Sequence, residues 1–522
     1  MNSIIVKDLV DKVRTYQKKT DIDKILKAFE FCKNAHSKQY RMSGEPFYHH
    51  PLEVAKLLTE IKLDSSSIAS GLLHDTIEDT SITIEDIKLN FGEEVSNLVD
   101  GLTKINRLAL KNNNLKLGEN YRKLLLATAQ DLRVILIKLA DRLHNMRTIK
   151  YVKDIDKQIK KAKETMEIYA PLADRMGMNR IRDELEDLSF EVLNNEARKL
   201  INNRLDEIKE DRTSSFKTIS FELTDILNQQ KITSQIIGRE KTPFSIWRKI
   251  QKKRVSLEQM TDIIGFRIIL KTVEDCYKAL GLFHSKYNCI PGKFKDYISS
   301  PKINNYQSIH TAIIGPNKRP IEIQIRTMPM HEFAERGVAS HWKYKSSEKF
   351  NSLTWKEYDW LKDLVEIIEK NQNPDHYFEY TKLQMFSENV FCFTPKGMII
   401  KLPKDASPID FAYAVHTKIG DAAIGCEING KESPLQSTLV NGDVVKILTS
   451  KKASPSLHWI TSTKTGKARA SIKRYWQNKD DSEDLQSKQY NTTLWISLID
   501  QPGKLGDVTT MIGENNVNIS SV

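Results

Sequence analysis

Residues 74–80 read HDTIEDT and bring four ionisable side chains into six positions. Apolar residues precede this segment, and the pattern predicts a helix. On one continuous helix Asp75 would face Asp79, and His74 would face Glu78 in the same way, because residues four apart are neighbours. Two stacked carboxylates repel each other. A cation bound between them would explain why a helix that enters a hydrophobic core tolerates this pattern.

Two further motifs supply side chains that would complete a metal site. His50 lies upstream, directly before a proline suited to the first turn of a helix. The downstream motif LADRLHNMRT places Asp141, Asn145 and Thr148 on one helical face. Imidazole and carboxylate together suit a divalent ion such as Mn²⁺, which lowers the pKa of a bound water for phosphoester hydrolysis. The alternative is a solvated helical face that binds nothing.

Length and composition indicate a multidomain globular protein. The chain has 522 residues, and single hydrophobic cores rarely grow beyond about 250–300 residues. No run of 18 apolar residues, no signal-peptide pattern and no CxxC pair occurs, which argues against a membrane span, secretion and a zinc site of the usual spacing. We expect a cytoplasmic protein. The net charge of +12 suits nucleotide phosphates or RNA, although a Lys-rich surface alone would give the same excess.

The sequence texture changes several times along the chain. The first part has a helical period and few Pro or Gly, whereas IIGFRIIL (263–270), TAIIG (311–315) and IEIQI (321–325) read as strands between helices. The expected segments are residues 1–195 (helical), 196–345 (α/β), 346–385 (helical linker), 386–450 (compact and β-rich), 451–490 (basic helix and polar linker) and 491–522 (strand, loop and helix).

A second set of polar residues lies in the α/β segment. The run GREKTPFSIWRKIQKKR (238–254) is strongly basic but contains neither a P-loop nor a G-x-G-x-x-G pattern. Its Arg and Lys side chains would therefore hold phosphates directly. Asp262 directly precedes one predicted strand and Glu322 opens another, and carboxylates so placed suit a Mg²⁺-bridged triphosphate. Each feature also has a simpler explanation: a solvated helix face, a core tyrosine at Tyr306, or the solvent side of a strand.

The motifs YRMSGEPFYHHPLEVA, LLHDTIEDT, GLTKI and KLADRLHNMRT resemble the hydrolase domain of the Rel/SpoT enzymes, which make and degrade guanosine tetra- or pentaphosphate. The resemblance implies an all-α HD-type domain. It implies that Mn²⁺ is held by His50, His74, Asp75 and Asp141. The positions that activate or orient the attacking water are Glu78 and Asp79, and those that hold the nucleotide are Arg41, Asn145 and Thr148. Met42 stands where the family usually has a second basic residue.

The strings GREKTPFSIWRK, MTDIIGFRI, PGKFKDYISSPK, NYQSIHT, IEIQIRT and MHEFAERGVASHWKYK resemble the family's nucleotidyltransferase-like α/β synthetase domain. By resemblance, two arginines enclose the adenine of ATP and the other residues meet its phosphates: Arg239, Lys241, Ser245, Lys249 and Arg267. Mg²⁺ is carried by Asp262 and Glu322, and Glu322 also activates the acceptor hydroxyl. The GDP or GTP acceptor is held by Lys295, Lys302, Asn304, Tyr306 and His310, with the tyrosine stacked on guanine.

Two positions of the acceptor loop depart from the family pattern. Lys293 stands where Arg is usual, and Asn305 replaces the Gly that usually precedes the stacking tyrosine. Asparagine tolerates positive φ better than most residues, so we expect the loop to keep its conformation. A weakened acceptor site is the alternative.

The C-terminal third resembles two regulatory modules of the same family. Residues 390–450 resemble the TGS module, a β-grasp fold that reads the 3′ end of uncharged tRNA on the ribosome, and His416 matches the contacting histidine. A spacer role is the alternative. The following segment, TSTKTGKARASIKRYWQN, is basic and consistent with RNA contact, although a solvated helix would look the same. The tail resembles the first half of a ferredoxin-like ACT domain.

These features predict a cytoplasmic, bifunctional enzyme with a multidomain α+β fold. One reaction transfers pyrophosphate from ATP to the 3′-hydroxyl of GDP or GTP and releases AMP. The other hydrolyses the product, (p)ppGpp, to GDP or GTP and pyrophosphate, as in the stringent response. The opposed reactions call for a conformational switch between the sites, and homo-oligomerisation is left open. The alternatives are a hydrolase with a weak synthetase, or a non-catalytic regulator that binds nucleotides, tRNA and ribosomes.

Overall fold

The computed structural model describes most of the chain. The described residues are 2–17, 21–104, 113–207, 209–253, 264–302, 304–315, 320–344, 389–450 and 452–483. The chain forms two compact units, residues 1–471 and 472–522. The whole linker expected at 346–385 and the whole tail expected at 491–522 lie outside the described residues. Among the residues that are described, no helix is long and apolar enough to cross a membrane.

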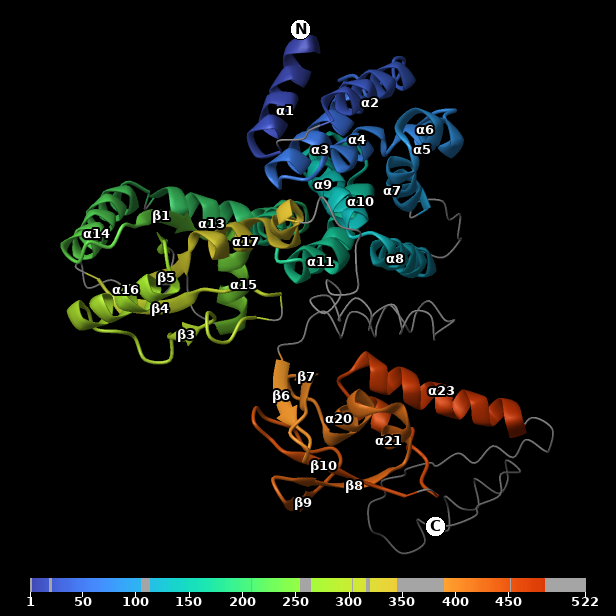
Figure 1. Cartoon of the computed structure of the whole chain (residues 1–522), viewed down its shortest axis with the longest axis vertical. Coiled ribbons are helices and arrows are strands. Elements are labelled where there is room, and N and C mark those ends of the chain that lie inside the picture. Colours follow the sequence, from blue (N-terminus) through green and yellow to red (C-terminus); the bar gives the residue numbers. More distant parts are fainter. Residues whose placement is uncertain are drawn as a thin grey trace, which may run out of the picture. The chain divides into compact units, whose positions relative to one another are not determined.

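The N-terminal part is helical, as the sequence predicts (Figure 1). Apolar side chains from α1 through α12 form one buried core, so each helix is held by its apolar face. The helices are α1 (Asn2–Tyr16), α2 (Ile22–Ala35), α3 (His49–Glu60), α4 (Ser65–Leu73), α5 (Thr76–Asp79), α6 (Ile84–Phe91), α7 (Glu93–Lys104), α8 (Asn113–Gln130), α9 (Arg133–Arg147), α10 (Ile155–Glu164), α11 (Ala170–Arg175), α12 (Asn179–Leu193), α13 (Asn195–Glu207) and α14 (Lys209–Gln229), with short turns η1 (Ile149–Tyr151) and η2 (Thr165–Tyr169).

The segment HDTIEDT is not one continuous helix, so this prediction is wrong. Helix α4 ends at Leu73 and α5 begins at Thr76. His74 Nδ1 lies 2.8 Å from the carbonyl oxygen of Gly71, and Thr76 Oγ1 donates to the Leu73 carbonyl at 2.6 Å. These side chains form hydrogen bonds with backbone carbonyl groups at the end of α4, which have no partner within the helix. The break lies at His74 and Asp75, two residues of the predicted metal site.

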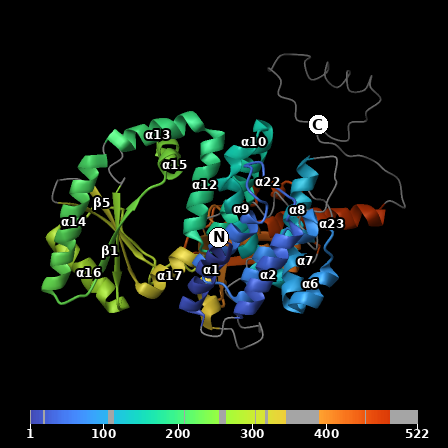
Figure 2. The ribbon, with the colours of Figure 1, turned by 90° about the horizontal axis from the view of Figure 1, so that it is seen from above.

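The α/β part is built on a five-stranded sheet of order β1-β2-β5-β4-β3, in which only β2 and β5 run parallel. Three predicted strands are confirmed as β2, β4 and β5. Helices α14 and α16 pack on one face of the sheet and bury its apolar side chains (Figure 2). The elements are β1 (Gln235–Glu240), α15 (Pro243–Lys253), β2 (Ile264–Leu270), α16 (Val273–Lys286), β3 (Lys295–Asp296), β4 (Ile309–Ile314), β5 (Pro320–Thr327), α17 (Met328–Arg336) and η3 (Gly337–Tyr344).

Two glycines mark a close backbone crossing between the helical and α/β parts. Gly177 follows α11 with φ +71°, and Gly337 follows α17 with φ +58°. The Met176 carbonyl accepts a hydrogen bond from Val338 N at 2.9 Å. A Cβ atom added at Gly337 would lie 2.0 Å from Met176 O. Only glycine combines this φ with so close an approach.

The described C-terminal elements form the small β-rich module that the sequence predicts. A three-stranded sheet, β10-β8-β9, and the hairpin β6-β7 enclose a small apolar core with helix α20. The start of α23 is fixed by Asp410, whose Oδ1 accepts from Thr465 N at 2.7 Å. The elements are β6 (Asn389–Phe393), β7 (Ile399–Pro403), α20 (Pro408–Val415), α21 (Thr417–Asp421), β8 (Ala423–Ile428), β9 (Lys431–Ser433), β10 (Val445–Thr449), α22 (Trp459–Ser462) and α23 (Gly466–Glu483).

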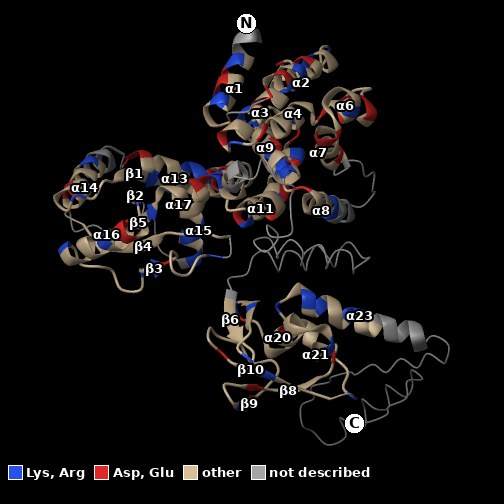
Figure 3. Ribbon diagram, in the orientation of Figure 1, with Lys and Arg blue, Asp and Glu red and all other residues tan. Residues whose placement is uncertain are grey.

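The basic segment after this module begins at the end of the short helix α22 and continues into the first half of α23, which carries most of its Lys and Arg residues (Figure 3). Arg469 Nη2 donates to the carbonyl of Thr463 at 2.7 Å. Arg469 therefore stabilises the local fold through this hydrogen bond, whether or not it also contacts RNA.

Candidate functional sites

Three buried side chains from different helices converge in the helical part. His50 belongs to α3, His74 follows α4, and Asp141 belongs to α9. One ligand atom from each lies within 4.8 Å of the others. His50 Nε2 is 3.2 Å from Asp141 Oδ1 and 3.5 Å from Asp75 Oδ2, and His74 Nε2 is 3.1 Å from Asp75 Oδ1. The structure thus brings together the four residues that the sequence proposes as metal ligands.

The chemistry of this cluster fits a divalent cation. His74 Nδ1 faces the Gly71 carbonyl, so it carries the proton and leaves Nε2 to face the cluster. That buried Nε2 has no hydrogen-bond partner among the described residues. Burial alone would lower the pKa of His74, but Asp75 and Asp141 raise it to about 9. The cluster therefore attracts positive charge, and its nitrogen and oxygen donors suit a borderline-hard ion.

A buried lysine also neutralises this cluster. Lys138 Nζ donates to Asp141 Oδ2 at 2.8 Å, and both side chains are buried. Burial would raise the pKa of Asp141, yet the charge of Lys138, with the neighbouring His50 and His74 rings, holds it well below its usual value. Asp141 therefore stays ionised and keeps its other oxygen, Oδ1, toward the histidines.

The residues predicted to hold the nucleotide or to activate water lie beside the cluster. Arg41 Nη2 donates to Asn145 Oδ1 at 3.0 Å, and Asn145 Nδ2 donates to Asp141 Oδ1 at 2.5 Å. Thr148 caps α9 and its hydroxyl donates to the His144 carbonyl. The predicted water-activating residues are exposed in or at the end of α5, at Glu78 and Asp79. Partial desolvation of its carboxyl group, with the charge of Asp75, raises the pKa of Asp79, which strengthens that carboxylate as a base.

His144 belongs to this site and was not singled out from the sequence, although it lies inside the quoted motif KLADRLHNMRT. Its Nδ1 is 2.7 Å from His50 Nδ1 and 3.2 Å from Arg41 Nη1. A guanidinium can only donate, so His144 Nδ1 is the acceptor and His50 Nδ1 carries a proton. Burial, with the charges of His50 and Arg41, lowers the pKa of His144 to about 3. His144 therefore leaves the lone pair of His50 Nε2 directed at the carboxylates.

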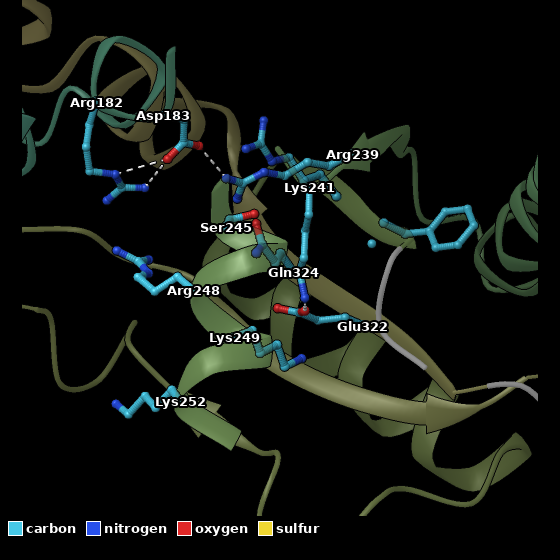
Figure 4. A pocket seen from close by; sticks show the side chains of 13 residues that line it. Arg182, Asp183, Arg239, Lys241, Ser245, Arg248, Lys249, Lys252, Glu322 and Gln324 are labelled. Atoms are coloured by element: carbon cyan, nitrogen blue, oxygen red, sulfur yellow. Dashed lines mark hydrogen bonds and ion pairs between the residues drawn. The ribbon is translucent and has the colours of Figure 1, made fainter. Parts of the chain in front are cut away.

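A cavity of about 610 Å³ lies against the sheet (Figure 4). Its lining is strongly basic and has two carboxylates, Asp183 and Glu322. The predicted ATP-binding residues all line it: Arg239, Lys241, Ser245, Lys249 and Arg267. Arg239 lies near the end of β1, Arg267 lies on β2, α15 carries Ser245 and Lys249, and Lys241 lies in the loop between β1 and α15. Such a basic cavity suits a polyphosphate.

Glu322 projects into the cavity from β5 and pairs with Lys241, whose Nζ lies 3.0 Å from Glu322 Oε2. Burial raises the pKa of Glu322, but Lys241, His310 and Lys249 together lower it below its usual value. The carboxylate is therefore ionised at neutral pH. Asp262, the other predicted Mg²⁺ ligand, lies outside the described residues. The residue Gly265 of β2 pairs directly with Glu322.

The acceptor-loop residues lie at β3, β4 and the loop before β4. Lys295 pairs with His310 between β3 and β4. Tyr306 is only 8% exposed, its hydroxyl is 2.8 Å from His310 Nε2, and Lys302 Nζ lies 5.1 Å from its ring centre. A nucleotide base can therefore stack on the Tyr306 ring only after side chains that bury the ring, such as Lys302, have moved. Asn304 Nδ2 donates to the Asp174 carbonyl of α11 at 2.8 Å, so its amide contacts the helical part.

Asn305 has φ +57°, which confirms the expected positive φ at this position. The asparagine thus adopts the left-handed conformation that a glycine would adopt there.

Four charged residues of the cavity lining were not predicted: Arg182, Asp183, Arg248 and Lys252. Arg248 and Lys252 recur with Ser245 and Lys249 at helical spacing on α15, so the period of the basic run contains a signal for them. Arg182 and Asp183 belong to α12, and no local pattern connects that helix to a phosphate site.

His416 lies at an exposed position between α20 and α21. Its Nδ1 accepts a hydrogen bond from Lys418 N at 3.1 Å, so the side chain caps α21. Because Nδ1 is an acceptor, Nε2 of the neutral ring carries the proton and is the nitrogen that remains to donate to a ligand.

Three family models match this chain in consecutive segments. An HD domain matches residues 28–179, a region found in RelA / SpoT proteins matches residues 238–349, and a TGS domain matches residues 390–449. The chain belongs to the Rel/SpoT family. The first match contains the histidine–aspartate cluster and the second contains most of the basic cavity, whereas Arg182 and Asp183 lie between the two.

Curated relatives agree with this assignment. GTP pyrophosphokinase rsh of Brucella ovis is 48% identical over 474 residues, which cover 90% of this Rel/SpoT chain and 63% of the relative. GTP pyrophosphokinase of Myxococcus xanthus is 43% identical over 477 residues, covering 91% and 63%. Guanosine-3′,5′-bis(diphosphate) 3′-pyrophosphohydrolase of Aquifex aeolicus is 45% identical over 459 residues, covering 88% and 65%. The chain thus spans less than two thirds of the length of these relatives.

Proposed function

We propose that this Rel/SpoT chain makes and degrades (p)ppGpp at two separate sites. The observation that carries the proposal is that one chain contains both a buried His50, His74 and Asp141 cluster and a basic cavity with the ionised carboxylate of Glu322. The names of its relatives include both a pyrophosphokinase and a pyrophosphohydrolase, so both reactions are known among close relatives.

In the synthetic reaction, Glu322 accepts the proton of the 3′-hydroxyl of GDP or GTP. The oxygen then attacks the β-phosphorus of ATP, the bond from that phosphorus to the bridging oxygen of the α-phosphate breaks, and AMP leaves. Lys241, Lys249 and Arg248 neutralise charge on the transferring group, which is the main work of a protein in phosphoryl transfer. Arg239 and Arg267 enclose the adenine, and Tyr306 stacks on guanine. We propose that Mg²⁺ is held by Glu322 and Asp262.

In the hydrolytic reaction, a divalent ion, which we propose to be Mn²⁺, would be held by His50, His74, Asp75 and Asp141. When bound, such an ion lowers the pKa of a water molecule. Arg41, Asn145 and Thr148 hold the nucleotide beside the cluster. Glu78 and Asp79 orient the water and take its proton. The water oxygen attacks the phosphorus attached to the 3′ oxygen, the bond between them breaks, and pyrophosphate leaves. The 3′ oxygen takes up a proton, so that GDP or GTP remains.

Nucleotide chromatography of the purified chain tests both reactions. One mixture contains ATP, GDP or GTP and Mg²⁺, and the other contains (p)ppGpp and Mn²⁺. We expect products in both, with Glu322→Gln abolishing synthesis alone and His74→Ala abolishing hydrolysis alone. Each variant is thus the folding control for the other. Hydrolysis without synthesis would indicate a weak acceptor site, which would agree with the unusual Lys293 and with the burial of Tyr306. Inactivity in both mixtures would contradict the proposal.

We also propose that the TGS module contacts the 3′ end of uncharged tRNA on the ribosome through His416, and that the protein acts in the cytoplasm. The exposed position of His416 supports this contact. His416→Ala should weaken binding of deacylated tRNA, measured with the full chain, whereas Lys446→Ala, an exposed residue of β10 that pairs with Glu427, should not. Equal binding by all three proteins would favour a spacer role.

A further inference from the structure

The two arginines proposed to enclose adenine are neighbours on one face of the sheet. In the antiparallel pair β1–β2, Ile237 lies opposite Arg267. Arg239, two residues after Ile237, points to the same face and is therefore a diagonal neighbour of Arg267. Both arginines line the large cavity and an adjoining cavity of about 340 Å³. Two like charges so close together need other groups to hold them in place.

Each of these arginines is held by one carboxylate from a helix. Arg239 Nη2 donates to Asp183 Oδ2 of α12 at 2.6 Å. Arg267 Nη1 donates to Glu335 Oε1 of α17 at 2.8 Å. Both carboxylates line the smaller cavity. In Figure 4, Asp183 lies between Arg239 and Arg182, which donates to its other oxygen at 2.6 Å.

The direction of these bonds matters for stacking. The N–H groups of a guanidinium lie in its plane, so a carboxylate that accepts from them lies at the edge of the group. Such a partner fixes the orientation of the plane and leaves its flat faces for an aromatic ring. A carboxylate that served only to neutralise charge could lie over the face instead.

Helix α12 also fixes the elements on either side of Arg239. Asp187 Oδ1 accepts from Phe244 N, in the first turn of α15, at 3.1 Å. Glu186 Oε1 lies 3.4 Å from Arg248 Nη1 of the same helix. One helix outside the matched synthetase region thus holds the end of β1 through Asp183 and the start of α15 through Asp187.

We infer that Asp183 is a positioning residue that holds the guanidinium of Arg239 as a platform for the purine base of the nucleotide donor, with Glu335 serving Arg267 in the same way. The inference rests on the proposed synthetase function and adds α12 to that site. Asp183 acts through Arg239 and touches no reacting atom. A synthetase fragment that starts after α12 would lack this support.

The test compares a ligand that has a base with one that has none. Isothermal titration calorimetry of the full chain with Mg²⁺ would measure the affinity for α,β-methylene-ATP and for inorganic tripolyphosphate. Asp183→Asn should weaken binding of the ATP analogue by roughly three- to tenfold, the range for one hydrogen bond, and leave tripolyphosphate binding unchanged. Asp183→Glu should restore part of the affinity. The matched control is Glu184→Gln, which removes a bidentate pair with Arg147 (2.6 and 2.9 Å) from the same helix and should change neither affinity.

A double variant tests whether Asp183 acts through Arg239. In an Arg239→Gln background, Asp183→Asn should cause no further loss of ATP-analogue affinity, and additive losses would overturn the inference. Equal weakening of both ligands by Asp183→Asn would also overturn it, because that result indicates a general effect on charge or folding. If the wild-type chain forms product while Asp183→Asn has no selective effect, the inference fails and the proposed function stands. A wild-type chain that binds no ATP analogue would overturn both.

Discussion

Lys241 Nζ lies 3.0 Å from Glu322 Oε2 in the basic cavity. The pair joins the loop after β1 to the middle strand β5. Burial raises the pKa of Glu322, whereas the ammonium group of Lys241 is the main cause that lowers it. The lysine that is proposed to meet the phosphates of ATP thus also keeps the proposed general base ionised.

Removal of Lys241 should therefore change the pH dependence of synthesis. In Lys241→Met the pKa of Glu322 rises, so a smaller fraction of the carboxylate is ionised at a given acidic pH. We expect the acidic limb of the kcat profile, measured at saturating ATP, to move to higher pH. Lys252→Met, which removes another lysine of the same cavity, should move it less. An unchanged limb in Lys241→Met would show that Glu322 does not set it.

Lys138 should stabilise the helical part when the metal site is empty. Lys138→Met leaves the buried Asp141 carboxylate without its cation, and loss of one partner of a buried pair typically costs about 3–5 kcal/mol. Urea unfolding with EDTA should show this loss, and added Mn²⁺ should reduce it. The control is Lys157→Met. It removes the ion pair of Lys157 with Asp154, which has the same three-residue spacing, but the Lys157 side chain is 68% exposed. Such surface pairs contribute about 0–1 kcal/mol, so an equal loss in both variants would contradict this role.

The same pair predicts a direction for the effect of acid. The pKa of Asp141 is lowered in the folded protein, so its contribution to stability is present above the unfolded value of about 3.9. The contribution is lost as the pH falls through the lower folded value, because the unfolded chain binds the proton first. In Lys138→Met the lowering is weaker, and the free energy of unfolding should depend less on pH in this range.

The sequence predicted most of the fold and much of both sites. Runs of β-branched residues marked β2, β4 and β5 because such residues fit a pleated sheet. Helical spacing placed Asp141 and Asn145 on one face, where they now share a hydrogen bond. The break in HDTIEDT was missed, because it depends on bonds from His74 and Thr76 to the end of α4, and local patterns do not specify such bonds.

The other features that the sequence did not predict depend on contacts between segments that are far apart in the chain. Asp183 meets Arg239 from 56 residues earlier in the chain, and its own surroundings in the sequence read as an ordinary charged helix. His144 lies 94 residues after the His50 ring that it contacts. The burial of Tyr306 could not be predicted either, since a stacking residue and a buried core residue give the same sequence pattern.

His144 should orient His50 for metal binding. Because it accepts from His50 Nδ1, it keeps the Nε2 lone pair toward the carboxylates, and loss of such an outer partner typically lowers metal affinity by about 10–100-fold. We expect that loss for His144→Leu, measured by electron paramagnetic resonance of free Mn²⁺. His144→Gln has an amide oxygen that can accept the same bond and should retain more affinity. Equal affinity in all three proteins would show that the two ring nitrogens do not interact in solution.

Gly337 should be irreplaceable where the α/β part crosses the helical part. An alanine there adopts φ +58° at a cost of about 1–2 kcal/mol, and its Cβ atom would lie 2.0 Å from the Met176 carbonyl oxygen. Neither backbone can yield without breaking the bond from Val338 N to that oxygen, so we expect a total loss of about 3 kcal/mol or more in urea unfolding. Gly292→Ala is the matched control: it has a similar φ of +72° but no atom within 4 Å, and it should cost only the conformational part. Equal losses for the two variants would mean that the crossing opens at little cost, so that the close approach at Met176 does not hold the helical and α/β parts together.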